Sequence, residues 1–138
     1  MKLKALLALP VTLLLIQGAA NAAFQASTSS DSMTVSTLVI SPVTNLQATA
    51  SCGPALSLKA KTVLTWTASS SSGITSYEIR RRLVAVTTAV GTVAIGTNTY
   101  TDNLLPVATT YGYTVRTYRG SWYADSSEVV VTTPTVCT

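Results

Sequence analysis

The chain has 138 residues, about the length of one domain, and carries a formal net charge of +4. Hydrophobic residues make up 47% and charged residues only 10%, which excludes an intrinsically disordered chain. Histidine is absent, so a histidine-based catalytic triad, metal site or pH switch is excluded. The 24 Thr and 16 Ser residues favour β structure, because Thr is β-branched and Ser populates turns.

Residues 1–22 have the pattern of a secretory signal peptide. Lys2 and Lys4 give a basic start, residues 5–16 form an apolar run, and Ala20-Asn21-Ala22 offers small residues at a cleavage site. The run is shorter than the ~20 residues that a membrane-spanning helix needs, and an uncleaved signal anchor is the alternative. We expect a secreted or envelope-associated chain of net charge +2, with no stable membrane insertion and too little charge to indicate nucleic acid.

Cys52 and Cys137 are the only cysteines. In an exported protein such a pair favours a disulfide over free reactive thiols, because neither cysteine has a histidine or a second nearby cysteine to lower its pKa. The bond would close a loop of 85 residues. A loop of that length is worth about 4–5 kcal/mol in the chain-entropy model, a large part of the stability of a small domain.

The exported part of the chain divides into a leader and a β domain. Residues 23–41 are rich in Ser and Thr, and we expect them to be flexible or extended, ending as a short strand at Leu38-Val39-Ile40. From residue 42 to 138, short β-type runs alternate with turn signals about every 8–12 residues, which predicts an all-β sandwich. The seven expected strands are 45–50, 62–67, 76–83, 92–95, 99–101, 110–118 and 128–133.

Alternation along these strands separates an inner from an outer face. Trp66 lies on a strand rich in β-branched residues, so we expect it at the centre of the core rather than in a ligand site. The expected core residues are Leu64, Trp66, Tyr77, Ile79, Tyr111, Tyr113 and Val115.

Three segments resemble the fibronectin type III family. Val63-Leu64-Thr65-Trp66 is similar to its second strand, residues 74–81 to its third, and residues 104–115 to the stretch that forms its tyrosine corner. The resemblance implies a seven-stranded immunoglobulin-like sandwich in which the Tyr111 hydroxyl bonds back to the chain upstream. It also places Cys52 and Cys137 at the same pole, although a disulfide there is not part of the family's usual pattern.

The sequence gives no support for catalysis. The five acidic residues are scattered over the leader, strands and loops, and none lies in an apolar run that would raise its pKa for acid–base work. No phosphate-binding loop, nucleophile elbow or metal-ligand cluster is present. We therefore expect no enzyme activity, no metal and no cofactor.

Arginines mark a candidate binding face. Alternation points Arg80 and Arg82 outward on one strand and Arg116 outward on its expected neighbour, with Arg119 at the end. The functional interpretation is a surface for anionic glycan, wall polymer or an acidic partner. The alternative is a solvated sheet face in which Glu78 pairs with one of the arginines.

Trp122 and Tyr123 follow the Arg119-Gly120 turn. Exposed there, they would stack on sugar rings or anchor a protein partner. The alternative is that Trp122 folds back over the end of the sandwich. They extend the candidate binding face, which then comprises Arg80, Arg82, Arg116, Arg119, Trp122 and Tyr123.

Two functions follow from these features. The first is a secreted, non-catalytic adhesion or binding module whose partner is an unknown protein or glycan of the cell envelope. The second is a structural subunit of a surface layer, pilus or fibre that self-associates by adding its leader to a neighbour's sheet. Residues 23–40, beginning Ala23-Phe24-Gln25-Ala26, resemble the mature start of camelysin-like exported envelope proteins, which is consistent with the second.

Overall fold

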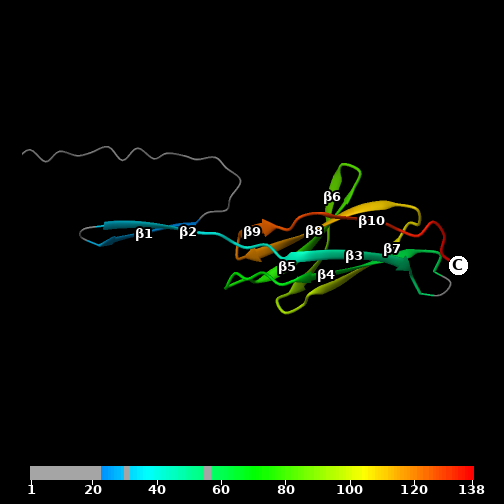
Figure 1. Ribbon diagram of the computed structural model, residues 1–138, viewed down its shortest axis with the longest axis horizontal. Helices are drawn as coiled ribbons and strands as arrows, with labels where there is room; N and C mark the ends of the chain where they lie inside the picture. Colours follow the sequence, from blue (N-terminus) through cyan, green and yellow to red (C-terminus); the bar gives the residue numbers. More distant parts are fainter. Residues whose placement is uncertain (1–22, 30–31, 55–56) are drawn as a thin grey trace, which may run out of the picture.

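The computed structural model describes residues 23–29, 32–54 and 57–138, and every regular element in them is a β-strand (Figure 1). The predicted signal peptide lies outside these residues. The strands are β1 (Ala23–Ser29), β2 (Ser32–Leu38), β3 (Thr44–Cys52), β4 (Ala60–Thr67), β5 (Ser76–Leu83), β6 (Val86–Ala94), β7 (Thr99–Leu105), β8 (Thr110–Arg119), β9 (Trp122–Asp125) and β10 (Val129–Thr132).

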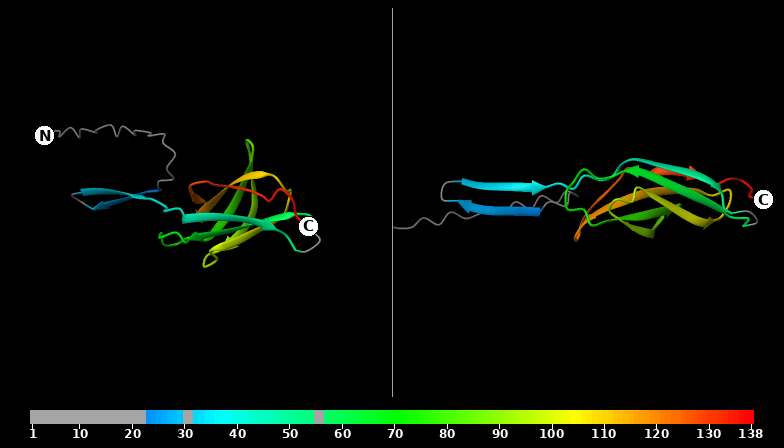
Figure 2. Two further views of the ribbon diagram at one scale, coloured as in Figure 1. Left: turned by 45° about the vertical axis from the view of Figure 1, so that its right-hand side comes forward. Right: turned by 90° about the horizontal axis from the view of Figure 1, so that it is seen from below.

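Strands β3 to β10 form a sandwich of two antiparallel sheets. One sheet has the order β3-β4-β7, and the other has the order β10-β8-β5-β6, with β9 also paired to β8. Figure 2 shows the two layers from other directions. The all-β sandwich expected from the sequence is therefore confirmed, with eight strands in place of seven.

The additional strand is β9, which lies in what the sequence analysis treated as a loop. β9 and β10 pair with successive parts of β8, and residues 126–128 separate them. The Ser126 side chain accepts a hydrogen bond from the Val115 amide at 3.0 Å, and its own amide donates to the Val115 carbonyl at 3.0 Å. This buried serine interrupts the strand without leaving the β8 backbone unpaired.

Two strand boundaries differ from the expectation by more than two residues. β6 begins at Val86, six residues before the expected start at residue 92, and β7 continues to Leu105 rather than ending at residue 101. The missed start has a simple cause. The β5–β6 turn consists of Val84 and Ala85, and it lacks the Gly, Asn or Asp that marks most two-residue hairpin turns.

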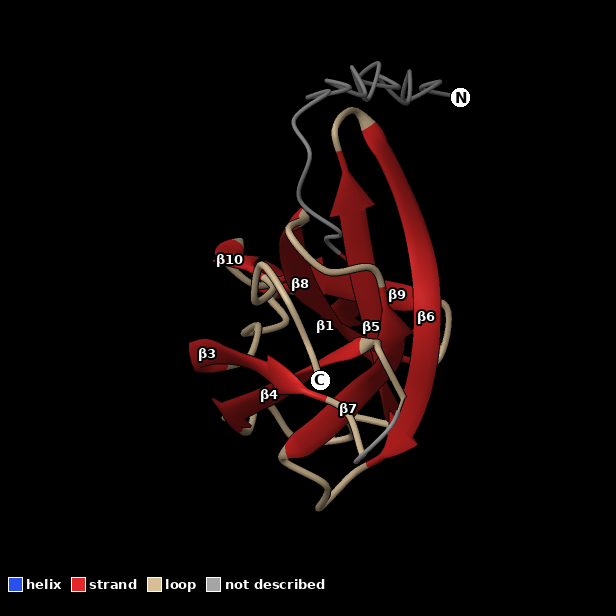
Figure 3. Cartoon of the chain, turned by 90° about the vertical axis from the view of Figure 1, so that its right-hand side faces the viewer, coloured by secondary structure: helices blue, strands red, loops and turns tan. Residues whose placement is uncertain are grey.

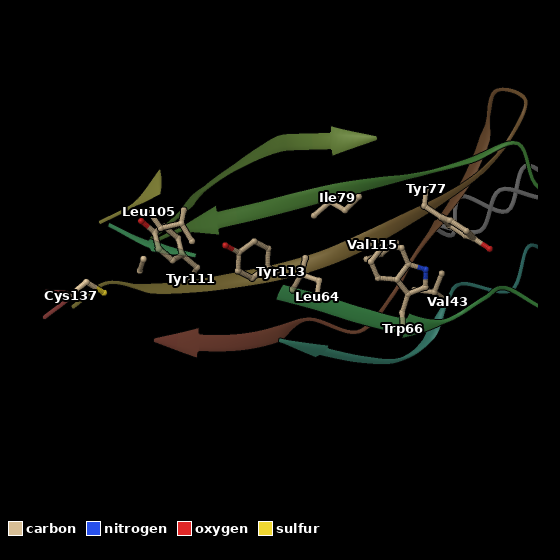
Figure 4. Close-up of a cluster of buried hydrophobic side chains, with 11 residues drawn as sticks. Val43, Leu64, Trp66, Tyr77, Ile79, Leu105, Tyr111, Tyr113, Val115 and Cys137 are labelled. Carbon is tan, nitrogen blue, oxygen red and sulfur yellow. The ribbon is translucent and has the colours of Figure 1, made fainter. Parts of the chain in front are cut away.

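The core lies between the sheets, and Figure 4 shows its side chains. Trp66 packs edge-on against Tyr77 with ring centroids 6.0 Å apart. All seven expected core residues are buried, so the alternation argument is confirmed for this face. The buried cluster contains Val43, Ala60, Leu64, Trp66, Tyr77, Ile79, Leu105, Tyr111, Tyr113, Val115 and Cys137.

A disulfide joins Cys52 to Cys137, as expected, with the two Cα atoms 5.4 Å apart. It ties the end of β3 to the C-terminal segment at one pole of the sandwich. The chain after β10 is thereby anchored to the other sheet, and the buried Cys137 becomes part of the core.

The tyrosine corner implied by the family resemblance is not formed. Among the described residues the Tyr111 hydroxyl has no hydrogen-bond partner, and the turn before β8 is held instead by the buried Thr133. The Thr133 hydroxyl lies 2.8 Å from the Pro106 carbonyl and accepts from the Thr109 amide at 2.9 Å. One residue more than the family pattern separates Pro106 from Tyr111, so the turn reaches Thr133 on the chain beyond β10.

The leader forms a hairpin rather than a flexible or simply extended segment. β1 and β2 pair from Ala23 with Leu38 to Ser29 with Ser32. The short strand expected to finish at Ile40 is wrong, because β2 ends at Leu38 and the buried Ile40 belongs to the link into the sandwich. In both views of Figure 2 this hairpin lies beyond one end of the sandwich, and the C-terminus lies at the other.

Candidate binding surface

Strand β5 carries two of the expected binding arginines on the outer face of the five-stranded sheet, and each has a carboxylate partner. Arg80 Nη1 lies 3.1 Å from Glu78 Oε1 on the same strand. Arg82 reaches Glu128 with two nitrogens, at 2.7 Å and 2.5 Å. The Glu128 carboxylate lies over Gly112 of β8, where an added Cβ would come within 2.5 Å of it, so the glycine allows this ion pair to cross the strand.

Strand β8 carries the third outward arginine, which is held from two sides. Arg116 donates to the two carboxylate oxygens of Asp125 on β9, at 2.7 Å and 2.8 Å. Its guanidinium carbon also lies 3.8 Å from the centre of the Tyr123 ring, a close cation–π contact. The hydrogen bond to Asp125 raises the pKa of Arg116, so this side chain stays charged at every physiological pH.

The outer face is therefore a set of closed ion pairs. Arg80, Arg82 and Arg116 are matched by three carboxylates, and the region has no net charge. For these three residues the structure agrees with the alternative interpretation, a solvated sheet face in which Glu78 pairs with an arginine, and strand register and the β9 turn bring an acid to the other two as well. They offer a ligand polar contacts, but not an excess of positive charge.

The fourth expected arginine lies differently. Arg119 ends β8, and in the described part of the chain it has no carboxylate within ion-pair distance. Its side chain crosses to the β4–β5 turn, where a Cβ added to Gly73 would lie 2.9 Å from Nε. Arg119 is thus the one arginine of five whose charge the protein leaves unmatched.

The expected loop aromatics start β9, directly across from Arg119. Arg119 pairs with Trp122 and Tyr118 pairs with Tyr123 in the β8–β9 register. Trp122 is 38% exposed and Tyr123 is 37% exposed, and the rings of Tyr118 and Tyr123 lie 6.0 Å apart. The β8–β9 hairpin therefore gathers Arg119, Trp122 and Tyr123 at one end of the sheet, next to the Arg116–Asp125 ion pair.

A buried polar cluster, which the sequence analysis missed, links the two sheets. Asp102 on β7 is 6% exposed and accepts from Arg81 Nη1 and from the Tyr113 hydroxyl, each at 2.8 Å. Burial, reinforced by Asp102, raises the pKa of Tyr113 well above its ordinary value. Alternation along β5 indicates this cluster. Arg81 lies on the same side of the strand as the buried Tyr77 and Ile79, and an inward arginine requires an acidic partner.

The described residues contain neither a metal-ligand cluster nor a membrane-spanning helix. No group of three His, Cys, Asp or Glu side chains is close enough there to hold a metal ion. No helix in that part of the chain is long and apolar enough to cross a membrane. The described acids Glu78, Asp102, Asp125 and Glu128 each pair with an arginine.

This sheet order and core define an immunoglobulin-like sandwich of fibronectin type III type, and comparison with solved structures agrees. Similar structures include the chicken CNTN1 FN1–FN3 domains (TM-score 0.56, 15% identity, 75% of this chain and 36% of that one). They also include the fn3 domain of the human collagen α-1(XX) chain (TM-score 0.50, 20% identity, 77% and 93%). Domains d3–d4 of the rat CD45 extracellular region match with a TM-score of 0.50 and 13% identity over 96% and 76%.

These likenesses show the fold alone, since all three identities are low. No family model and no curated protein matches the sequence. The resemblance to the fibronectin type III family, based on three sequence motifs, is confirmed for the fold.

Proposed function

We propose that this protein is an exported, non-catalytic binding module of the cell surface or extracellular space, and that it contacts its ligand through the β8–β9 hairpin. The observation that carries the proposal is the grouping of the unmatched Arg119 with the exposed Trp122 and Tyr123. Exposed aromatic rings beside a free guanidinium favour a sugar ring stacked on Trp122 and a carboxylate or sulfate bound by Arg119.

Three further features support this proposal. The disulfide is of the kind that forms in an oxidising compartment, and residues 1–22 have the pattern of an export signal. The fibronectin type III fold is typically non-catalytic, and one of its structural neighbours is an extracellular region. Each described carboxylate forms an ion pair with an arginine, which favours a structural role for these acids over acid–base catalysis.

The test is binding of the exported protein to isolated native envelope and to an array of acidic glycans. Trp122→Ala should reduce affinity by about tenfold or more, the effect of removing an aromatic anchor. Arg119→Gln should weaken binding and flatten its salt dependence, because exposed charges are screened beyond about 8–10 Å at physiological ionic strength.

The matched control is the double variant Arg82→Gln with Glu128→Gln, which removes a complete ion pair of the same sheet, keeps the net charge and changes no residue of the β8–β9 hairpin. It should fold and bind as the wild type does. If this control loses binding while Trp122→Ala and Arg119→Gln retain it, the ligand contacts the sheet around Arg82 and the β8–β9 proposal is wrong.

A further inference from the structure

Strand β6 is an edge strand that carries no charge. It lies at one end of the five-stranded sheet and pairs only with β5 within the described chain. From Leu83 to Tyr100 the sequence contains no charged residue and no proline. Natural edge strands are usually protected against pairing with other chains by charges, prolines or a covering segment, so an unprotected edge of this kind is a docking surface for another strand.

Half of this edge is covered. A bulge at Val90 interrupts the pairing of β5 with β6, and the Tyr100 hydroxyl donates to the Val90 carbonyl at 2.6 Å. The Tyr100 ring lies so close to Gly91 that an added Cβ would come within 2.4 Å of it. The bulge and Tyr100 protect the middle of β6, which leaves residues 86–89 and 92–94 open, and the longer open part is residues 86–89.

The open part belongs to a hairpin tip that projects from the sandwich (Figures 1 and 3). Residues 83–89 are all exposed, although they include Leu83, Val84 at 82% and Val86 at 66% exposure. Val84 has a φ of 54°, a conformation that is strained for a β-branched residue and that glycine adopts freely. The tip therefore exposes apolar side chains to solvent. At Val84 it also keeps a strained backbone where the fold itself needs only a glycine.

The strands of the leader hairpin, like the edge of β6, are uncharged and have backbone groups free to pair. In the described residues β1 and β2 form a two-stranded sheet of their own, and neither strand contains a charged residue. They pair from Ala23 with Leu38 to Ser29 with Ser32, so the outer backbone edge of each strand has no partner in the described residues. A two-stranded hairpin is marginal in water by itself, and it gains stability by joining a larger sheet.

The two segments lie apart in one molecule. The link between β2 and the sandwich is fixed at the β4–β5 turn, where Ser41 bonds Ser69 and Ser71. β5 starts beside this turn, and the apolar tip follows its far end, about 26 Å away for eight residues of strand. The hairpin points away from the sandwich beyond that turn (Figure 2), so a second molecule offers the more direct partner.

From the unprotected edge and the unattached leader we propose that residues 86–89, with the apolar turn before them, bind the β1–β2 hairpin of a second copy of this chain. The hairpin adds to the free edge of β6 through backbone hydrogen bonds, beside the exposed Leu83, Val84 and Val86. The β1–β2 hairpin, which is donated, and the β6 edge, which accepts it, are different surfaces of the chain. The contact is therefore head to tail and repeats from copy to copy. This self-association goes beyond the binding function proposed above and does not depend on it.

The experiment compares variants of the exported protein by sedimentation velocity over a wide range of concentrations. The edge variant Val86→Lys with Thr88→Lys places charges on the open edge. The leader variant Ala26→Pro with Val35→Pro removes backbone donors from β1 and β2. The matched control, Val130→Lys with Thr132→Lys, makes the same changes at exposed positions of β10, the opposite edge of the same sheet.

The wild type and the β10 control should form chains that lengthen with concentration, and the edge and leader variants should each remain monomeric. A mixture of the edge and leader variants should form a one-to-one dimer that grows no further, because one supplies only a donor and the other only an acceptor. The dimer shows that the leader variant keeps a folded β6 edge, and a cooperative thermal transition like that of the wild type shows that the sandwich of the edge variant is folded.

Several results would overturn the proposal. A wild type that stays monomeric at every concentration would mean that the edge is not used. Assembly of the leader variant to the wild-type extent would indicate direct pairing of two β6 edges. A mixture that contains only monomers would also contradict it, as would loss of assembly in the β10 control. Binding to envelope, measured on Trp122→Ala, reports on the other proposal independently.

Discussion

Strands β5 and β6 are neighbours in one sheet, yet they treat charge in opposite ways. β5 is a central strand and carries Glu78, Arg80, Arg81 and Arg82, each of which has a partner of opposite charge. β6 is the edge strand and carries no charge. Charges are ordinarily placed on the edge, where they prevent unwanted pairing. In this sheet the charges of the central strand form ion pairs within the domain, and the β6 edge has no charge that would oppose pairing with another chain.

The largest expected effect concerns the one charge of β5 that faces inward. Arg81→Met should lower the free energy of unfolding by about 3 kcal/mol, because it leaves the buried Asp102 carboxylate without its cation. Arg80→Met is the outward control. Its partner Glu78 is not buried, so this substitution should change the free energy of unfolding by no more than about 0.5 kcal/mol. Denaturant unfolding with the disulfide intact measures both. Equal effects would mean that the inward and outward arginines are not distinct.

A smaller effect of opposite sign is expected at the turn that joins the two strands. Val84→Gly should raise the free energy of unfolding by about 1 kcal/mol, because glycine adopts the positive φ at the first turn position without strain. Val86→Gly, which lies in the strand, should lower it. The same denaturant experiment compares the two. A loss of stability in Val84→Gly would show that the tip side chain stabilises the free monomer, which would remove one argument for its role in assembly.

The smallest effect tests the outward ion pairs of β5 by pH. The hydrogen bond from Arg82 lowers the pKa of Glu128 below its ordinary value of 4.5. A carboxyl whose pKa is lower in the folded state contributes stability above the unfolded pKa and loses it as the pH falls through the folded pKa. Glu128→Gln should therefore unfold at slightly lower denaturant concentration than the wild type at pH 7, and the difference should shrink as the pH falls below 4.5. A difference that persists at low pH would contradict this origin.

The alternation of residues predicted the inner face of this protein well. Leu64 and Trp66 on β4, and Tyr77 and Ile79 on β5, are buried as expected, because side chains of a strand alternate by local geometry alone. The same rule was available for Arg81, and it indicated an inward charge. The rule does not identify the partner of this charge, since Asp102 lies 21 residues away on another sheet.

The candidate site was only partly predictable. The exposure of Trp122 and its place near Arg119 follow from the Arg119-Gly120 turn, where Gly120 has a φ of 59°. The state of Arg82 does not, because its partner Glu128 is 46 residues away and reaches it across Gly112. Which acid meets which arginine depends on strand register, and a single sequence carries little information about it.

Residue chemistry and a period of two along each strand were enough to indicate the β class, the composition of the core and the pairing of the two cysteines. The neutralisation of the three outward arginines, the buried Asp102 between the sheets and the edge position of the uncharged β6 are evident only in the folded chain. Each of these depends on how distant segments align in space. An arginine is a free ligand-binding group or half of a closed ion pair according to its neighbour, and the neighbour is set by the fold.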